Sequence, residues 1–588
     1  MTRAVATTGL RLAPAAIDIE TRADGVMLLR SPQTLEQGAR VVADWLAHWA
    51  QHRADQTFLA ERDGDGWRKL SYAQALVQVR RVAQGLLARG LDASRPVVVL
   101  SDNSIDHALL ALGAMHVGVP VAPVSPAYSL MSADHAKLRY VFELLKPGLV
   151  YAADPARFAG ALAAVGMQAT PLAELMTEEP GAAVDAAHAA TGPDTVAKLL
   201  FTSGSTGMPK GVLNTQRMIT TNQQQAVQLW PFMVDTPPVV VDWLPWNHTF
   251  GGNYTFNLVL ANGGTLYIDG GKPAPGLIET SVRNLKEIAP TMYFNVPRGF
   301  DLLMPYLESD EQLRRNLFSR CRFVFYAGAA LPQNLYERFA KMARETSPEP
   351  VYVVSAWGST ETAPLATAVH FPVDKAGVIG LPVPGCELKL VPSAGKLEVR
   401  LRGPNVTPGY FGRPDLSAQA FDDQGYYKIG DALKFVDLAY PEQGLAFDGR
   451  VAEDFKLVTG TWVHVGALRV KLIAACDPVV QDAVITGHDR DEIGALLFLN
   501  PAVASGMSPQ QLRDRLRDAL ALLARDAAGA SSLRIDRVMA LDSPPQLDAG
   551  EITDKGYLNQ RAVLQSRAGE VQRLYASPPD DAVIFCPE

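Results

Sequence analysis

Short apolar runs alternate with amphipathic helical patterns over the first three-quarters of the chain. The clearest helical pattern spans residues 71–89, where Ser71 and Gln74 form a capping-box pair and Gly90 ends the pattern. Its apolar stripe consists of Tyr72, Leu76, Val79, Ala83 and Leu86. Buried strands are predicted at residues 97–100, 199–201, 239–244, 265–268, 292–296, 323–326 and 351–355. This alternation predicts an α/β fold in which helices cover parallel or mixed sheets and the loops at the carboxyl ends of the strands carry the chemistry.

The pattern changes after about Gly380. Residues 396–402 alternate strictly between polar and apolar positions, which is typical of an antiparallel strand with one solvated face. A small β-rich subdomain is therefore predicted at residues 380–448.

From Arg450 onward the pattern is α+β. The predicted elements there are strands at 483–485 and 496–499 and a helix at 509–525. These changes divide the chain into a large N-terminal domain, residues 1–449, and a small C-terminal domain, residues 450–588.

The composition excludes several broad classes of protein. The chain has 588 residues, 48% hydrophobic and 20% charged, so a wholly disordered chain is excluded. Its 54 Lys and Arg against 62 Asp and Glu give a net charge of −8, which lacks the basic footprint of nucleic-acid binding. Four dispersed cysteines without a Cys-x-x-Cys pair fit a reducing cytosol. Glycines and prolines break the uncharged run at 108–133, so we expect a helix-turn-strand passage in a core, no membrane span and a cytoplasmic location.

The strongest local signal for chemistry follows the predicted strand at 199–201. The loop after it carries four hydroxyls, three glycines and a lysine, namely Thr202, Ser203, Gly204, Ser205, Thr206, Gly207, Lys210 and Gly211. Glycines let backbone N–H groups turn inward, and a lysine adds a cation, so these are the parts of a phosphate-binding loop. A flexible Ser/Gly linker is the alternative, but the buried strand before it and the Pro-Lys-Gly after it favour the phosphate loop.

Five more motifs follow in a fixed order. They are residues 326–332 (YAGAALP), 357–362 (WGSTET), 405–410 (NVTPGY), 427–431 (YKIGD) and 448–450 (DGR). Together with the phosphate loop, this series resembles the adenylate-forming superfamily of acyl-CoA synthetases, luciferases and peptide-synthetase adenylation domains.

The resemblance implies roles for individual residues. Lys210 would neutralise phosphate charge, Thr360 would contact the α-phosphate, and Glu361 would bind magnesium. Asp431 would bind the ribose hydroxyls, and Arg450 would lie at the domain junction. The remaining nucleotide-binding candidates are Gly328, Ala329, Ala330, Trp357, Gly358 and Ser359. Taken singly, Asp431 is more typical of a turn residue and Glu361 of a solvated carboxylate than of a binding site.

Residues 243–254 (WLPWNHTFGGNY) resemble the acyl-pocket motif of the same superfamily. His248 would lie beside the substrate carboxylate, although a structural, hydrogen-bonded histidine is the alternative. The other acid-binding candidates are Trp246, Phe250, Asn253, Tyr254 and Gly328. The density of aromatic side chains suits an aromatic acid, although aromatics also fill cores.

The C-terminal tail departs from the common pattern. Most relatives carry a Gly-Lys-Ile there, whereas this chain has Gly550-Glu551-Ile552, with Lys555 four residues after Glu551. The segment 550–561 is similar to that of bacterial feruloyl-CoA synthetases, which implies that Lys555 is the catalytic lysine. The alternative is a surface pair between Glu551 and Lys555 on one helix.

The expected activity is that of an ATP-dependent, feruloyl-type acid–CoA ligase. Its cofactors and substrates would be ATP, magnesium, coenzyme A and a small aromatic carboxylic acid, with no nucleic acid or membrane as a partner and a homodimer left open. The resemblance also implies a C-terminal domain that rotates about a hinge near residues 452–454. Alternatives are a ligase for a benzoate or fatty acid, a ligase with a carrier-protein acceptor, and a non-catalytic acyl- or nucleotide-binding module.

Overall fold

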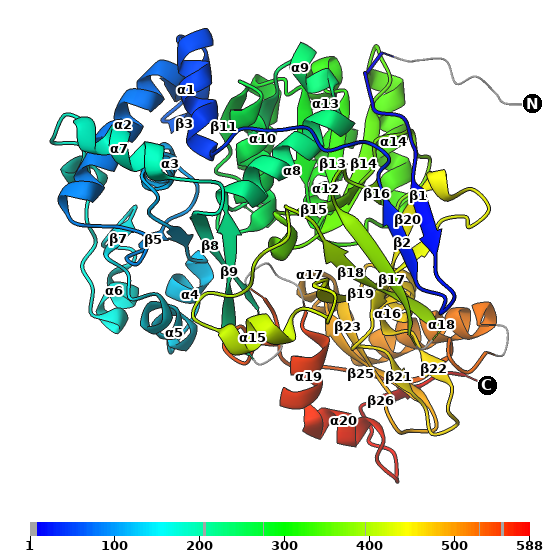
Figure 1. Cartoon of the computed structure of the whole chain (residues 1–588). Helices are drawn as coiled ribbons and strands as arrows, with labels where there is room; N and C mark the ends of the chain where they lie inside the picture. Colours follow the sequence, from blue (N-terminus) through cyan, green and yellow to red (C-terminus); the bar gives the residue numbers. More distant parts are fainter. Residues whose placement is uncertain are drawn as a thin grey trace, which may run out of the picture.

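The computed structural model describes residues 9–203, 207–274, 276–393, 395–527, 530–553 and 558–587. In these ranges the strands form five sheets, three of them before residue 451 and two after it (Figure 1). The elements of the C-terminal part, coloured orange and red, lie below the larger N-terminal part (Figure 1). Mixed, helix-covered sheets with a small α+β C-terminal part confirm the predicted fold class.

The largest sheet has eleven strands in the described part of the chain. In spatial order they are β1 (Asp18–Thr21), β2 (Met27–Arg30), β17 (Glu387–Ser393), β18 (Lys396–Arg402), β19 (Tyr427–Phe435), β20 (Leu445–Arg450), β16 (Val378–Pro382), β15 (Leu365–Ala368), β14 (Tyr352–Gly358), β13 (Phe323–Tyr326) and β12 (Met292–Asn295). β12, β13 and β14 pair in parallel, and the other neighbours are antiparallel. The strictly alternating segment is β18, as predicted. The β-rich segment thus extends the sheet that carries the parallel strands.

Two more sheets complete the N-terminal part. One consists of β7 (Leu149–Ala152), β5 (Val97–Leu100), β6 (Val121–Pro123), β8 (Val196–Ser203) and β9 (Pro209–Thr215), in that order. The other consists of β10 (Val239–Asp242), β11 (Thr265–Ile268), β3 (Thr57–Asp63) and β4 (Gly66–Ser71). β9 and β4 are antiparallel to their neighbours, and the remaining pairs are parallel.

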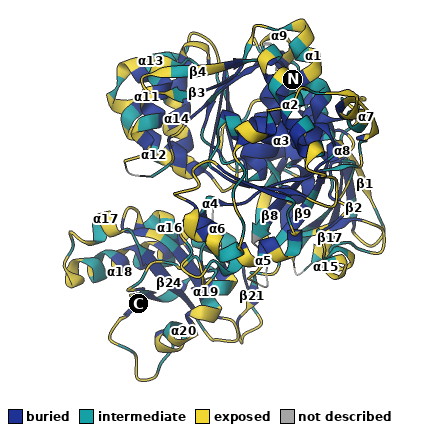
Figure 2. Cartoon of the chain, turned by 90° about the vertical axis from the view of Figure 1, so that its left-hand side faces the viewer, coloured by how far each residue is buried: buried dark blue, intermediate teal, exposed yellow. Residues whose placement is uncertain are grey.

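Helices of the N-terminal part follow the predicted periodicity. The capping box is formed by Ser71 and Gln74, and it begins α2 (Tyr72–Ala88). Almost every residue of α3 (Ile105–His116) is buried, which explains the uncharged run there; Figure 2 shows this helix in the buried colour. The other α-helices are α1 (Val42–His52), α4 (Pro126–Leu130), α5 (Ala136–Leu145), α6 (Ala159–Val165), α7 (Ala182–Ala190), α8 (Gln216–Leu229), α9 (Phe232–Asp235), α10 (Phe256–Ala261), α11 (Ile278–Glu287), α12 (Pro297–Ser309), α13 (Glu311–Arg320), α14 (Gln333–Thr346) and α15 (Pro414–Gln419). Short 3₁₀ segments are η1 (Leu172–Leu175), η3 (Thr360–Thr362) and η4 (Pro441–Gln443), and η2 (Phe250–Thr255) is a π-helix.

The C-terminal part has its own apolar core. Its strands are β21 (Phe455–Lys456), β22 (Trp462–Val463), β23 (Val480–Thr486), β24 (Ile493–Leu499), β25 (Ile535–Ala540) and β26 (Val583–Phe585). Its helices are α16 (Val465–Cys476), α17 (Pro501–Ala504), α18 (Pro509–Asp526), α19 (Gln560–Ser566) and α20 (Ala568–Leu574). The predicted helix at 509–525 is therefore confirmed as α18. Across the described ranges, none of the helices combines the length and apolarity that crossing a bilayer requires.

A buried ion pair holds the tail loop against α19 and α20. The Glu551 side chain is 2% exposed and accepts hydrogen bonds from Arg567 Nε at 2.6 Å and Nη2 at 2.9 Å. Ser566 Oγ and the Gln546 N–H also donate to this carboxylate. Burial alone would raise the pKa of Glu551, but these hydrogen bonds hold it below its usual value. Glu551 therefore has a structural role in the tail.

Replacing Glu551 by alanine leaves Arg567 buried without its principal partner. Breaking a buried pair in this way costs about 3 kcal/mol, so Glu551→Ala should lower the stability of the C-terminal part by that amount. Hydrogen exchange of the β23 and β24 amides across a urea series measures it. Glu570→Ala is the matched control, because Glu570 lies 3.7 Å from the same arginine but is 31% exposed; its loss should stay below about 1 kcal/mol. Equal losses in the two variants would contradict the structural role of Glu551.

Candidate active site

The predicted phosphate loop connects β8 to β9. Thr202 and Lys210 pair across this antiparallel hairpin, so their side chains lie on one face. The Lys210 ammonium lies 5.2 Å from the centre of the Tyr410 ring, within the range of a cation–π interaction. Gly207 has φ +89°, a left-handed conformation that favours glycine.

Backbone hydrogen bonds join this hairpin to the 405–410 motif. The Leu213 N–H donates to the Gly409 carbonyl at 3.1 Å, and the Phe411 N–H donates to the Gly211 carbonyl at 2.8 Å. Two segments almost 200 residues apart in the sequence are thereby held in register.

This register places Tyr410 between the lysine and a carboxylate. The Tyr410 hydroxyl lies 3.2 Å from Glu361 Oε1 and 3.2 Å from the Tyr427 hydroxyl. Burial, together with the negative charge of Glu361, raises the pKa of Tyr410. The phenol therefore stays protonated and donates to the carboxylate. Lys210, Tyr410 and Glu361 form one contiguous group.

Glu361 and Thr360 are buried in η3, directly after β14. The Glu361 N–H donates to Ser359 Oγ at 3.2 Å, and a Cβ at Gly358 would collide with the Pro364 carbonyl. No three His, Cys, Asp or Glu side chains converge as a metal site in the described ranges. Magnesium is typically held by one or two carboxylates together with substrate phosphates and water. Glu361 beside the phosphate hairpin fits such an ion.

Asp431, in β19, is buried next to Trp357. The Trp357 Nε1–H donates to Asp431 Oδ2 at 3.1 Å, and Arg450 Nε lies 3.6 Å from Oδ1. Burial raises the pKa of Asp431 to about 6, although Arg450 and Trp357 act to lower it. Among the described residues no donor is hydrogen-bonded to Oδ1. A buried acceptor in this state fits a hydroxyl donor such as that of a ribose.

The predicted adenine turn follows β13. Gly328 has φ +88°, and residues 328–330 are exposed. Because β12, β13 and β14 are parallel, this turn and the WGSTET motif leave the same edge of the sheet. The exposed turn, Trp357 and Asp431 therefore belong to one region.

The last five residues of the acid motif, 250–254, lie in the π-helix η2, which continues into α10. His248 is half-buried, and its Nδ1 accepts the Phe250 N–H at 3.2 Å. A Cβ at Gly251 or Gly252 would collide with the carbonyl of Leu244 or Trp246. Single π-turns occur frequently at functional sites. The glycines allow this one to pack against the segment before it.

Aromatic packing fills the space behind the acid motif. The Tyr254 ring lies 5.3 Å from Phe325 and 5.9 Å from Phe294, and Phe250 lies 5.6 Å from Phe325. Phe250, Tyr254 and Trp246 are buried, and Asn253 has no exposed surface. Phe250 and Tyr254 form the inner wall next to β12 and β13. Trp246 packs instead against Phe256 and His107. Asn253 is hydrogen-bonded to Asn214, and His248 is half-buried.

Several predicted residues lie outside the description. They are the side chain of Ser203 and residues Gly204, Ser205, Thr206 and Lys555; their roles stay predictions. Conversely, sequence reasoning assigned no role to Tyr410 or Tyr427, although both belong to motifs that it singled out. The position of Tyr410 between Lys210 and Glu361 results from the pairing of β9 with residues 409–411, which the sequence does not reveal.

Comparison with known proteins places this arrangement in a family. The sequence profile described as AMP-binding enzyme matches residues 46–411, and that described as AMP-binding enzyme C-terminal domain matches residues 457–578. The chain belongs to the AMP-binding enzyme family.

Curated and solved relatives cover most of the chain. The long-chain-fatty-acid–CoA ligase FadD15 of Mycobacterium bovis is 24% identical over 87% of this chain and 92% of its own length. The carboxylic acid reductase of Mycobacterium tuberculosis is 26% identical over 84% of this chain and 46% of its own length. The solved adenylation domain of a carboxylate reductase from Mycobacterium chelonae has a TM-score of 0.70 at 20% identity, with 92% of each chain covered. The last similarity concerns the fold.

Membership of this family confirms the resemblance to adenylate-forming enzymes at the level of the superfamily. AMP-forming ligases of the family use ATP and CoA, so the chain is of the AMP-forming acid–CoA ligase type. The curated relatives include fatty-acid ligases, so the feruloyl-type acid is not established by membership.

The raised pKa of Asp431 predicts a pH effect on ATP use. The carboxylate accepts hydroxyl hydrogen bonds, and below pH 6 it becomes a protonated, weaker acceptor. Lowering the pH from 7.5 to 5.5 should therefore raise the KM for ATP about fourfold through this group. The Asp431→Asn variant should have a higher KM for ATP at pH 7.5, and this KM should not rise further at pH 5.5 through residue 431. Titration of ATP itself affects both enzymes equally, so the difference between their pH profiles reports on Asp431. Parallel pH profiles would contradict the assignment of Asp431 to the ribose.

Proposed function

We propose that the chain activates a small aromatic acid of the hydroxycinnamate type with ATP and transfers the acyl group to CoA. The packed rings of Phe250, Tyr254, Phe294 and Phe325 are the observation that favours a short, flat acid. A long alkyl chain needs a channel, and these side chains occupy the space directly behind the acid motif. The similarity of the tail to feruloyl-CoA synthetases supports the same class of substrate.

In the first half-reaction, a carboxylate oxygen attacks the α-phosphorus of ATP. The bond from this phosphorus to pyrophosphate breaks, and an acyl adenylate forms. Lys210 neutralises phosphate charge, and Asp431 with Trp357 fixes the ribose and adenine end. Magnesium held by Glu361 would supply further neutralisation of phosphate charge. Catalysis then consists of alignment and electrostatic stabilisation.

In the second half-reaction, the CoA thiolate attacks the acyl carbon and AMP leaves. The family resemblance implies that the C-terminal domain, residues 450–588, rotates between the two steps. In the described conformation Lys396 is ion-paired with Asp454 and donates to the Asp448 carbonyl at 2.6 Å, and both ion-paired side chains are 6% exposed. Because the Lys396–Asp454 pair spans the junction, rotation about residues 452–454 has to keep or exchange it.

A fatty acid is the second candidate substrate, since curated relatives are long-chain-fatty-acid–CoA ligases. Thioester formation with ferulate, coumarate, caffeate, benzoate and decanoate separates the two candidates. We expect the hydroxycinnamates to give the highest kcat/KM, and a preference for decanoate would overturn the aromatic assignment. Absence of pyrophosphate exchange with every acid would favour a binding module.

Removing the Tyr254 ring should widen the range of acids. Tyr254→Ala opens a cavity behind the motif, so the ratio of decanoate to ferulate kcat/KM should rise about tenfold, which corresponds to about 1.4 kcal/mol of added contact. Tyr254→Phe is the matched control, because among the described residues the buried Tyr254 hydroxyl has no hydrogen-bond partner; its ratio should match the wild type. An unchanged ratio in a folded Tyr254→Ala protein would contradict the proposed wall.

Lys555 is the proposed cation for adenylation. It is the sole lysine between Lys471 and the C-terminus, so no nearby lysine can replace it. Lys555→Ala should abolish carboxylate-dependent pyrophosphate exchange while a supplied acyl adenylate still reacts with CoA. Arg561→Ala, which removes an exposed cation from α19, should leave both half-reactions intact. Retained exchange in Lys555→Ala would reject this role.

A further inference from the structure

A lysine that no motif includes is buried in β8. Lys198 is 5% exposed, and its Nζ donates to the Gly252 carbonyl at 2.6 Å. Within the described ranges Lys198 forms no salt bridge, and burial is the one cause that shifts its pKa. Burial lowers the pKa of Lys198 to about 7. Burying an amine without an ion pair costs free energy of folding. The hydrogen bond from Lys198 to Gly252 therefore calls for a functional or structural reason.

The acceptor of this hydrogen bond lies in the middle of η2. Gly252 is four residues after His248, and its carbonyl also accepts Asn257 Nδ2 at 3.3 Å. In a π-turn the backbone ladder is irregular, so side chains have to satisfy its carbonyls. Lys198 supplies the shortest of these contacts.

Other buried amides hold the same turn. Asn253 Nδ2 donates to Asn214 Oδ1 at 2.8 Å, and Asn214 faces Lys198 across the β8–β9 hairpin. From α8, Gln223 Nε2 donates to the Asn253 carbonyl at 3.1 Å and the Tyr254 carbonyl at 3.2 Å. Lys198 and Asn214 therefore connect the acid motif to the hairpin that carries Thr202 and Lys210.

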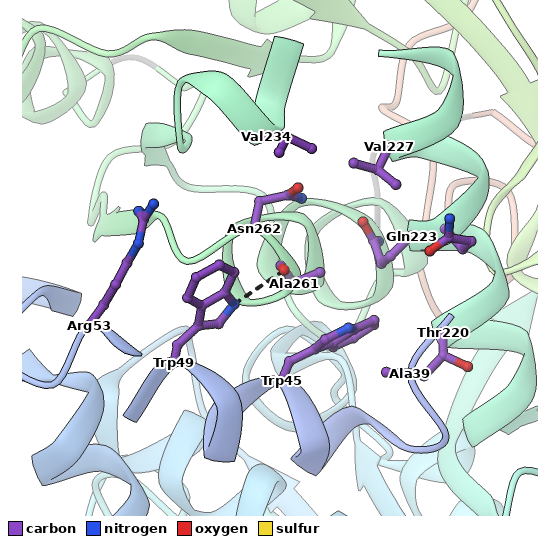
Figure 3. Close-up of a pocket in the computed structure, with 11 residues that line it drawn as sticks. Ala39, Trp45, Trp49, Arg53, Thr220, Gln223, Val227, Val234, Ala261 and Asn262 are labelled. Carbon is purple, nitrogen blue, oxygen red and sulfur yellow. Dashed lines mark hydrogen bonds between the residues drawn. The ribbon is translucent and has the colours of Figure 1, made fainter. Parts of the chain in front are cut away.

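A cavity of about 190 Å³ lies between α1, α8 and the end of α10, lined by Trp45, Trp49, Gln223, Ala261 and Asn262 among others (Figure 3). Trp49 reaches across it and donates to the Ala261 carbonyl at 3.2 Å. The lining of this cavity includes no residue of η2. The π-helix η2 is held by the contacts from β8 and β9 together with those of Gln223 from α8.

We propose that Lys198 is a positioning residue: through Gly252 it fixes the π-turn, and with it the acid-binding surface around His248, to the phosphate hairpin. The expected effect of Lys198 on acid binding rests on the proposed function, whereas its expected effect on the stability of η2 is independent of that function. The acid-binding and nucleotide-binding segments are thus fixed relative to each other. Loss of the contact is expected to weaken acid binding more than ATP binding.

Lys198→Met tests this, because methionine keeps the length and apolar stem but removes the donor. Loss of this buried hydrogen bond should raise the KM for the best acid of the panel about tenfold and leave the KM for ATP within about twofold. Lys198→Gln, which keeps an N–H donor, should recover most of the acid KM. Hydrogen exchange of residues 250–257 in the ligand-free protein should accelerate about tenfold in the Met variant, with β12 and β13 unchanged.

The exchange measurement separates this inference from the proposed function. If no acid of the panel is ligated but exchange of the π-turn accelerates in the Met variant and recovers in the Gln variant, the proposed function fails and the positioning role stands. Unchanged exchange at 250–257, or equal rises in the two KM values with no recovery by glutamine, would overturn the role of Lys198.

Discussion

The pairing of the β8–β9 hairpin with residues 409–411 is the constraint on which the site depends. Two backbone hydrogen bonds fix this register. They bring Lys210 from one sheet against Tyr410, which lies in the loop between β18 and α15. The Tyr410 hydroxyl in turn meets Glu361 after β14 and Tyr427 in β19. No single sheet carries Lys210, Tyr410 and Glu361 together. The distances between these three residues therefore depend on the backbone pairing of β9 with residues 409–411.

Buried charges in this chain divide into two kinds. Glu551 is surrounded by donors from Arg567, Ser566 and Gln546, so its charge is fully satisfied within the fold. Asp431 keeps an oxygen without a hydrogen-bond donor in the described part of the chain, and Lys198 has a carbonyl where an ion pair would be expected. Complete satisfaction is typical of structural pairs, whereas a buried group with incomplete satisfaction needs a further explanation, which for Asp431 is the proposed ribose hydroxyl.

Much of the fold follows from local patterns in the sequence. The capping box at Ser71, the helix at 509–525 and the alternating strand at 396–402 depend on neighbours within a few residues, and the structure confirms them. The pairing of β2 with β17 joins positions some 360 residues apart, and no local pattern encodes such a pair. The same limit applies to the site: motif residues were recognisable one by one, but the contacts of Tyr410 and Lys198 arise from strand register.

In the C-terminal tail, the spacing of the usual motif does not identify the residue that supplies positive charge, because the motif has changed. An overlay on the usual Gly-Lys-Ile puts Glu551 in the position of the lysine, yet this carboxylate is buried against Arg567 and cannot approach a phosphate without breaking that pair. The reaction still brings a carboxylate and a phosphate together, and two negative groups need a cation between them. The loop just before residues 554–557 contacts the N-terminal part, where the Ala133 N–H donates to Asp548 and Lys137 donates to the Leu547 carbonyl. With Glu551 committed to structure, Lys555, four residues further along the chain, is the cation that we propose for this step.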